Sequence, residues 1–326
     1  MKKKISVIIV LVMLTSLFSG CSGTAQGENG KLSIVTTIFP EYDWVMNILG
    51  EKAADADVTM LLDNGVDLHS FQPTADDIIK ISNCDLFIYI GGESDEWVDD
   101  ALKTVKNENM ISLNLMQLLG DRVKEEEEVE GMQEEEHGHE HGEDEEHEEY
   151  DEHIWLSLKN ASGACGIITD ALCEADEENA ETYKANLLEY TVKLNTLDEQ
   201  YKNVVENASK KTVIFGDRFP FRYLFDDYGL EYFAAFKGCS AESEASFETI
   251  SFLAEKTDEL GLGCVMTLEG TDGKIAKTVI ENTKSKNAKI LSMNSMQSVT
   301  AADVENNASY LEITEKNLEV LKTALS

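Results

Sequence analysis

Short apolar runs alternate with helical patterns along most of the chain. "LSIVTTIF" (32–39) and "CDLFIYIG" (84–91) indicate buried strands, whereas "PTADDIIKISN" (73–83) has helical spacing with Thr74 as its cap. A second series of the same kind begins at "TVIFGD" (212–217). The alternation predicts an α/β fold with two lobes, each a mainly parallel four-stranded sheet flanked by helices.

A long amphipathic helix separates the two series. Its apolar positions recur at alternating steps of four and three, over roughly 30 Å; they are Tyr183, Leu187, Tyr190, Leu194, Leu197, Tyr201 and Val204. A simple two-helix packing element would explain this seam, but its position favours a rigid strut. We therefore expect a first lobe over 32–180, a linking helix over 181–209 and a second lobe over 210–326.

The N-terminus has the pattern of an export signal. Lysines precede a short apolar run, and small residues lead to Cys21. "FSGC" resembles a bacterial lipobox, which implies cleavage before Cys21, a lipid on that cysteine and anchoring to the outer face of the cytoplasmic membrane. A plain secretory signal with a chance cysteine is the alternative. Residues 1–21 are thus the expected signal and 22–31 a flexible tether.

Charge is concentrated in one stretch. The formal net charge is −36, and residues 125–152 hold seventeen Asp or Glu and no Lys or Arg. Such a surface repels nucleic acid and attracts cations. Because residues from about 121 to 150 have few apolar side chains, they predict a disordered surface loop. The five cysteines after Cys21 show no CxxC spacing, which disfavours a zinc ribbon, and leave disulfide pairing open.

One histidine stands where a parallel sheet binds ligands, and we expect a second to face the same cleft. His69, in "DNGVDLHSFQPTADD", lies between a strand and a helix, and His153, in "DEHIWLSL", opens the next folded segment. Imidazole suits Zn²⁺ and other late transition metals. Either histidine alone would more often be structural, but together they predict a metal site.

The acidic loop supplies further imidazoles, which are His137, His139, His141 and His147. In a flexible loop these would bind several ions weakly, because binding must order the chain. Incidental histidines in a solvated acidic segment are the alternative. We favour an auxiliary role that raises the local zinc concentration.

The segments "GVDLHSFQPTADDI", "DLFIYIGGESDEW", "DEHIWLSLKNA" and "YGLEYFAAF" resemble the solute-binding proteins of metal-uptake ABC transporters. The zinc-binding branch of that family carries a histidine- and acid-rich loop just before the second ligand histidine. The resemblance implies two lobes joined by one long helix, a metal between them and delivery to a membrane permease. We expect a monomer.

The second lobe departs from that family. A third histidine usually comes from a "HDAF"-like turn after its first strand, but this chain has "FGDRFPFRY" there. Asp217 is our first candidate ligand, although a gapless match places Gly216 at the ligand position. Glu269 and Glu244 are alternatives, and Asn294 lies near the family's fourth, acidic ligand.

The sequence predicts a binding protein for Zn²⁺. Two histidines with carboxylates make a plausible zinc site, and more oxygen ligands would suit Mn²⁺. A manganese-binding protein and a surface adhesin or metal scavenger remain alternatives. No HExxH, GxSxG or P-loop occurs, so a metal-dependent hydrolase is a remote alternative and we expect no enzyme.

Overall fold

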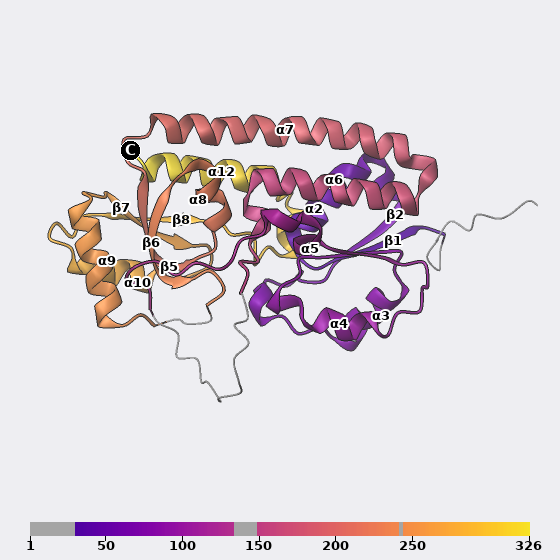
Figure 1. Ribbon diagram of the computed structural model, residues 1–326, viewed down its shortest axis with the longest axis horizontal. Coiled ribbons are helices and arrows are strands. Elements are labelled where there is room, and N and C mark those ends of the chain that lie inside the picture. The colour runs from indigo at the N-terminus through magenta and orange to yellow at the C-terminus, as the bar shows by residue number, and fades with distance from the viewer. Residues whose placement is uncertain (1–29, 134–148, 241–243) are drawn as a thin grey trace, which may run out of the picture.

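The computed structural model describes residues 30–133, 149–240 and 244–326. The chain forms two lobes side by side, each around its own sheet (Figure 1). The strand orders are β2-β1-β3-β4 and β6-β5-β7-β8, and all neighbouring strands run parallel. The predicted fold class of two α/β lobes is confirmed.

The elements follow the predicted alternation. The first lobe contains β1 (Leu32–Thr36), α2 (Phe39–Leu49), β2 (Ala56–Met60), α3 (Ala75–Asn83), β3 (Leu86–Tyr89), α4 (Trp97–Leu102), β4 (Ile111–Asn114), α5 (Leu115–Leu119) and α6 (Leu158–Ala175). The second contains β5 (Thr212–Phe219), α8 (Arg222–Tyr228), β6 (Glu231–Lys237), α9 (Phe247–Glu259), β7 (Cys264–Leu268), α10 (Lys274–Asn282), β8 (Lys289–Met293), α11 (Ala301–Glu305) and α12 (Tyr310–Ala324). Every residue of β3 and β7 is buried, as expected for sheets covered on both faces.

The linking helix is α7 (Ala180–Asn207), which runs along both lobes (Figure 1). It packs on α2 and α6 in the first lobe and on α8 and α12 in the second. Tyr190 donates a hydrogen bond to Asp43 at 3.3 Å, and Tyr201 donates to the backbone oxygen of Thr314 at 2.7 Å. The predicted seam therefore contacts the two lobes at once.

Helix α12 makes a second connection between the lobes. Tyr310 packs edge-on against Trp44, with ring centroids 5.4 Å apart, and its hydroxyl donates to the backbone oxygen of Trp155 at 2.7 Å. Buried residues of both lobes belong to one continuous hydrophobic cluster. Opening the lobes widely would expose this surface, at about 25 cal/mol per Å² of apolar area. The packing thus favours local rearrangement over a wide hinge motion.

Part of the segment predicted to be a disordered loop is ordered in the structure. Residues 124–133, here called the acidic strap, lie on the second lobe. Lys124 donates to Asp226 at 2.5 Å, the Tyr232 hydroxyl donates to Glu127 at 3.0 Å, and the Gln133 N–H donates to the Ala235 oxygen at 2.9 Å. These contacts offset the entropy lost on ordering the strap. The predicted signal, with Cys21, and the four loop histidines lie outside the described residues.

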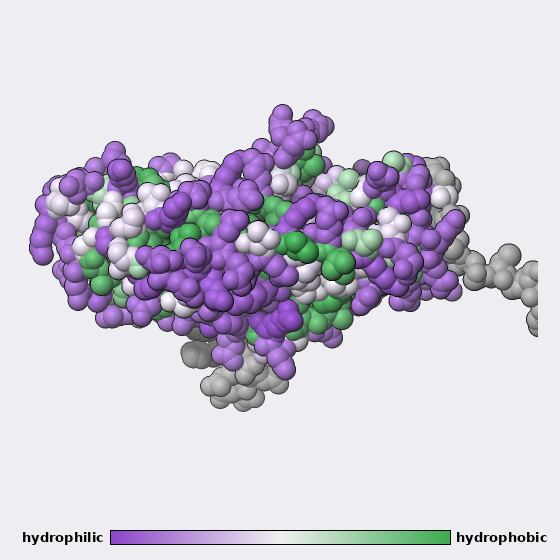
Figure 2. Space-filling view, turned by 90° about the horizontal axis from the view of Figure 1, so that it is seen from above, coloured by the Kyte–Doolittle hydropathy of each residue, from purple (hydrophilic) through white to green (hydrophobic). Residues whose placement is uncertain are grey.

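The outer face that carries α7 is mainly hydrophilic (Figure 2). Leu188 and Val192 are exceptions on that helix, with 70% and 58% of their surface exposed. Within the described ranges, no helix is both long and apolar enough to cross a membrane. Five cysteines there are free thiols and form no disulfide with one another; they are Cys84, Cys165, Cys173, Cys239 and Cys264.

Candidate metal centre

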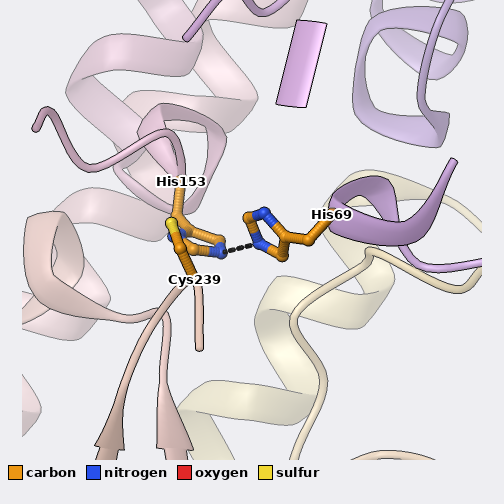
Figure 3. A group of neighbouring side chains, drawn as sticks. All are labelled: His69, His153 and Cys239. Atoms are coloured by element: carbon orange, nitrogen blue, oxygen red, sulfur yellow. Dashed lines mark hydrogen bonds between the residues drawn. The ribbon is translucent and has the colours of Figure 1, made fainter. Parts of the chain in front are cut away.

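His69 and His153 meet between the lobes. His69 lies in a short 3-10 turn, Leu68–Ser70, which follows β2. His153 directly precedes another 3-10 turn, Ile154–Leu156. Their Nε2 atoms are 3.2 Å apart (Figure 3). Two nitrogens bound to one tetrahedral zinc are separated by roughly 3.3 Å, given Zn–N bonds of about 2.0–2.1 Å. The pair therefore has the spacing of two ligands of one ion.

A cysteine that the sequence analysis did not select completes the group. Cys239 follows β6 of the second lobe, and its sulfur lies on the same side as His153, opposite His69 (Figure 3). One ligand atom from each of His69, His153 and Cys239 lies within 4.8 Å of the others. Because thiolate and imidazole are preferred zinc ligands, this group can hold a zinc ion.

Oxygen partners fix the orientation of both imidazoles. His69 Nδ1 lies 2.8 Å from Ser94 Oγ and 3.5 Å from Glu152 Oε2. His153 Nδ1 lies 2.9 Å from Asp151 Oδ1, which also accepts the His153 N–H at 2.8 Å. Such partners are typical of metal-binding histidines, because they leave the other ring nitrogen free for the metal.

The imidazole and the thiol, the two kinds of candidate ligand, differ in how readily they lose a proton. Burial and the neighbouring His153 lower the pKa of His69 to about 3, although Asp67 opposes this shift. Burial, with the nearby Glu126 and Glu152 carboxylates, raises the pKa of Cys239 well above that of a free thiol. Without metal, His69 is thus neutral at neutral pH, whereas Cys239 keeps its proton and must lose it to bind zinc.

Gln297 supplies an oxygen at the same place. It is buried in the second lobe, after β8. With its amide oriented to satisfy its neighbours, Oε1 lies 2.7 Å from His153 Nε2, and the amide nitrogen donates to the Asp67 carboxylate at 3.0 and 3.2 Å. The amide oxygen thus lies beside the histidine pair, which makes Gln297 a candidate fourth ligand. No sequence pattern singled out Gln297.

Asp67 connects the first-lobe histidine to the second lobe. Its carboxylate accepts the His69 N–H at 3.1 Å and forms an ion pair with Arg218 of β5. Burial opposes its charge, but the Arg218 guanidinium and the contacts with His69 together outweigh burial and lower the pKa of Asp67. The His69 turn is therefore held to the second lobe by a charged contact.

The other predicted carboxylate ligands do not join this group. Asp217 accepts from Thr267 Oγ1 at 2.7 Å and from the Leu268 N–H at 3.2 Å, so its carboxylate fastens the end of β7. Glu269 is used by Ser295, whose N–H and hydroxyl donate to it at 2.8 and 2.7 Å. Burial raises the pKa of Glu269.

The two remaining candidates have other roles as well. The Glu244 side chain is 86% exposed and lies 3.9 Å from Lys274 Nζ. Asn294 Oδ1 accepts the Met296 N–H at 2.7 Å, which closes the turn after β8. In the part of the chain that the structure describes, Cys239 and Gln297 are the second-lobe residues that offer a candidate ligand atom beside the histidines.

Two α/β lobes, a long connecting helix and a histidine–cysteine group between the lobes define a two-lobed metal-binding protein. The chain belongs to the family described as zinc-uptake complex component A, periplasmic, whose model matches residues 34–324.

Individual relatives agree with this assignment. The zinc-binding lipoprotein AdcA of Streptococcus pneumoniae is 31% identical over 98% of this chain and 60% of its own length. The high-affinity zinc uptake system protein ZnuA of Bacillus subtilis is 29% identical over 100% of this chain and 99% of its own. The crystal structure of the Zn(II)-bound ZnuA-like domain of S. pneumoniae AdcA matches 91% of this chain and 99% of that domain, with a TM-score of 0.70 and 26% identity. The chain spans about three fifths of the length of its AdcA relatives.

Proposed function

We propose that this protein captures Zn²⁺ outside the cytoplasm and delivers it to the permease of an ABC importer. The observation that carries the proposal is the convergence of His69, His153 and Cys239, whose ligand atoms lie within 4.8 Å of one another. The names of AdcA and ZnuA, which describe zinc binding and zinc uptake, support the same cargo.

The ligand set favours zinc over manganese. Two imidazoles, a thiolate and an amide oxygen contain one soft sulfur and a single oxygen donor. Mn²⁺ prefers oxygen ligands, whereas thiolate and imidazole suit Zn²⁺. Carboxylate ligands from the second lobe would have favoured Mn²⁺, and a thiolate from Cys239 in their place removes that reason to expect manganese.

The proposed site is suited to holding an ion and not to catalysis. A catalytic zinc keeps one position for water or substrate, whereas a site with four protein ligands is closed. His69, His153, Cys239 and Gln297 together provide four ligand atoms. Release to a permease then requires one or more of these ligands to move.

Anchoring and the auxiliary loop complete the proposed role. A lipid on Cys21 would hold the protein at the outer face of the membrane, and the tether of residues 22–31 would let the two lobes reach a permease. His137, His139, His141 and His147 would collect zinc weakly near the site. The word lipoprotein in the name of AdcA supports the anchor.

Competitive titration of the metal-free protein with Zn²⁺ and Mn²⁺, with bound metal counted by mass spectrometry, tests this function. We expect one tight zinc and several weaker ones. The double variant His69→Ala/His153→Ala should lose the tight zinc, and deletion of residues 134–148 should lose only weak ions. Glu244→Gln, which removes an exposed carboxylate outside the site, is the matched control. Tight zinc binding by the double variant, or a tight preference for Mn²⁺, would overturn the proposal.

A further inference from the structure

Cys239 lies where regular structure has ended. Strand β6 ends at Lys237, two residues before the thiol. A metal ligand in such a place needs its backbone to be held. The Cys239 N–H donates to Glu126 Oε1 at 3.3 Å. Glu126 belongs to the acidic strap, so the second-lobe ligand is held by a segment that leaves the first lobe.

The strap begins as one side of a short antiparallel stem. The Asp151 N–H donates to the Lys124 oxygen at 2.9 Å, and the Glu126 N–H donates to the Glu149 oxygen at 2.7 Å. Asp151, on the other side of the stem, accepts from both His153 N–H and His153 Nδ1. One stem thus carries the partner of Cys239 and the partner of His153.

The stem is fixed to the second lobe. The Tyr223 hydroxyl of α8 donates to the Asp151 oxygen at 2.7 Å and accepts the Lys124 N–H at 3.0 Å. His153 and Asp151 are almost fully buried, with 0% and 2% of their surface exposed. The distance between His153 and Cys239 is therefore set by contacts that do not involve the first sheet.

We propose that Glu126 is a positioning residue of the metal site, which holds the backbone of Cys239 so that its sulfur and His153 form a preformed half-site. His69 then completes the site from the other lobe. This inference rests on the proposed function, because it needs Cys239 to be a zinc ligand. The proposed action depends on the reach of the Glu126 oxygen and not on its charge.

Two substitutions separate reach from charge. Glu126→Gln keeps an oxygen at the same distance and removes the charge, whereas Glu126→Asp keeps the charge and withdraws the oxygen. Glu128→Ala is the matched control, because it removes a charge from the same strap at a residue that contacts Lys237 at 3.9 Å. Glu126→Ala is a second variant without the acceptor, and either acceptor-deficient variant that folds decides the question.

The readouts are zinc affinity, from competition with a chelator, and the thiolate-to-metal charge-transfer band of the cobalt-substituted protein. We expect Glu126→Asp to weaken zinc binding by about 10–100-fold, which is the usual effect of losing a residue that hydrogen-bonds to a metal ligand. The same variant should diminish the charge-transfer band. Glu126→Gln and Glu128→Ala should match the unaltered protein in both readouts.

The outcomes distinguish this inference from the proposed function. If the unaltered protein shows no cobalt–thiolate band, Cys239 is not a ligand and the proposed site itself falls. If that band is present and Glu126→Asp leaves it and the zinc affinity unchanged, only the positioning role is overturned. A loss in Glu126→Gln that matches or exceeds the loss in Glu126→Asp would show that the oxygen's reach does not decide the effect, and would also overturn it.

Discussion

Gly216 of β5 is packed directly against the backbone of Ala276 in α10. A Cβ at Gly216 would lie 2.4 Å from the Ala276 Cα and 2.6 Å from its nitrogen, distances that real side chains do not adopt. The gapless match to the family turn places Gly216 at the position of its histidine ligand. Helix α10 therefore occupies the space that this side chain would need, and the proposed second-lobe ligand, Cys239, instead follows β6.

Restoring a histidine at this position should therefore fail. Gly216→His would force α10 away from β5, at a cost of about 1–3 kcal/mol or more in the free energy of unfolding. We expect a lower melting temperature and no gain in zinc affinity, measured by thermal unfolding and chelator competition. Gly263→His, at an exposed glycine with no atom within 4 Å of its Cβ position, is the control. A stable Gly216→His protein that binds zinc more tightly would contradict this account.

Cys239 should determine the preference for zinc over manganese. Cys239→Asp replaces a soft sulfur by a hard oxygen, which suits Mn²⁺ better than the thiolate does. We expect the zinc affinity to fall by at least about 100-fold, because loss of a ligand should cost more than the loss expected for a residue that only positions a ligand. Mn²⁺ binding should be kept or improved. Paired titrations with both ions measure the ratio. Cys264→Ser, which removes another buried thiol from β7, should leave the ratio unchanged.

The fold was largely predictable because its signals are local and repeated. The strand–helix alternation and the seam from Tyr183 to Tyr201 need no knowledge of distant contacts, and both match the structure. The acidic strap was not predicted, because its order depends on partners such as Asp226, Tyr232 and Ala235, a hundred residues away in the chain. Composition alone cannot reveal such pairing.

The site was predictable only in part, for a related reason. His69 stood out because it follows a strand at the carboxyl edge of a parallel sheet. Cys239 follows β6 at the corresponding edge of the second sheet, so the same rule would have selected it. The cysteines were instead judged by their spacing, which is uninformative for a site with one thiol. Gln297 gave no signal, because a neutral amide becomes a candidate ligand only through its placement beside His153.

Zinc binding should release about one proton near neutral pH. The raised pKa of Cys239 keeps its thiol protonated in the metal-free protein, whereas His69, with a pKa of about 3, has no proton to lose. The zinc affinity should therefore fall about tenfold for each pH unit of acidification in this range. Calorimetry in two buffers with different ionisation enthalpies counts the protons. Cys239→Ala should release about one proton fewer, and heats independent of the buffer in the unaltered protein would contradict the assignment.

A buried carboxyl in the first lobe should make the metal-free protein less stable as pH rises. Burial, reinforced by the charge of Glu152, raises the pKa of Asp95 to about 7. Burial, together with the charge of Asp95, also raises the pKa of Glu41. The stabilising proton on Asp95 is present in full below the pKa of the unfolded chain, and its contribution is lost as pH rises through about 7. Asp95→Asn stays neutral and keeps an oxygen for the Gly91 N–H, which donates to Asp95 at 2.9 Å. Thermal unfolding in the presence of a chelator should show that Asp95→Asn raises the free energy of unfolding by on the order of 2–4 kcal/mol at pH 8. The increase at pH 5 should be much smaller. Asp100→Asn, at an exposed carboxylate, is the control and should leave the free energy of unfolding unchanged at both pH values. An equal loss of stability for Asp95→Asn at pH 5 and pH 8 would show that Asp95 is needed in its charged form.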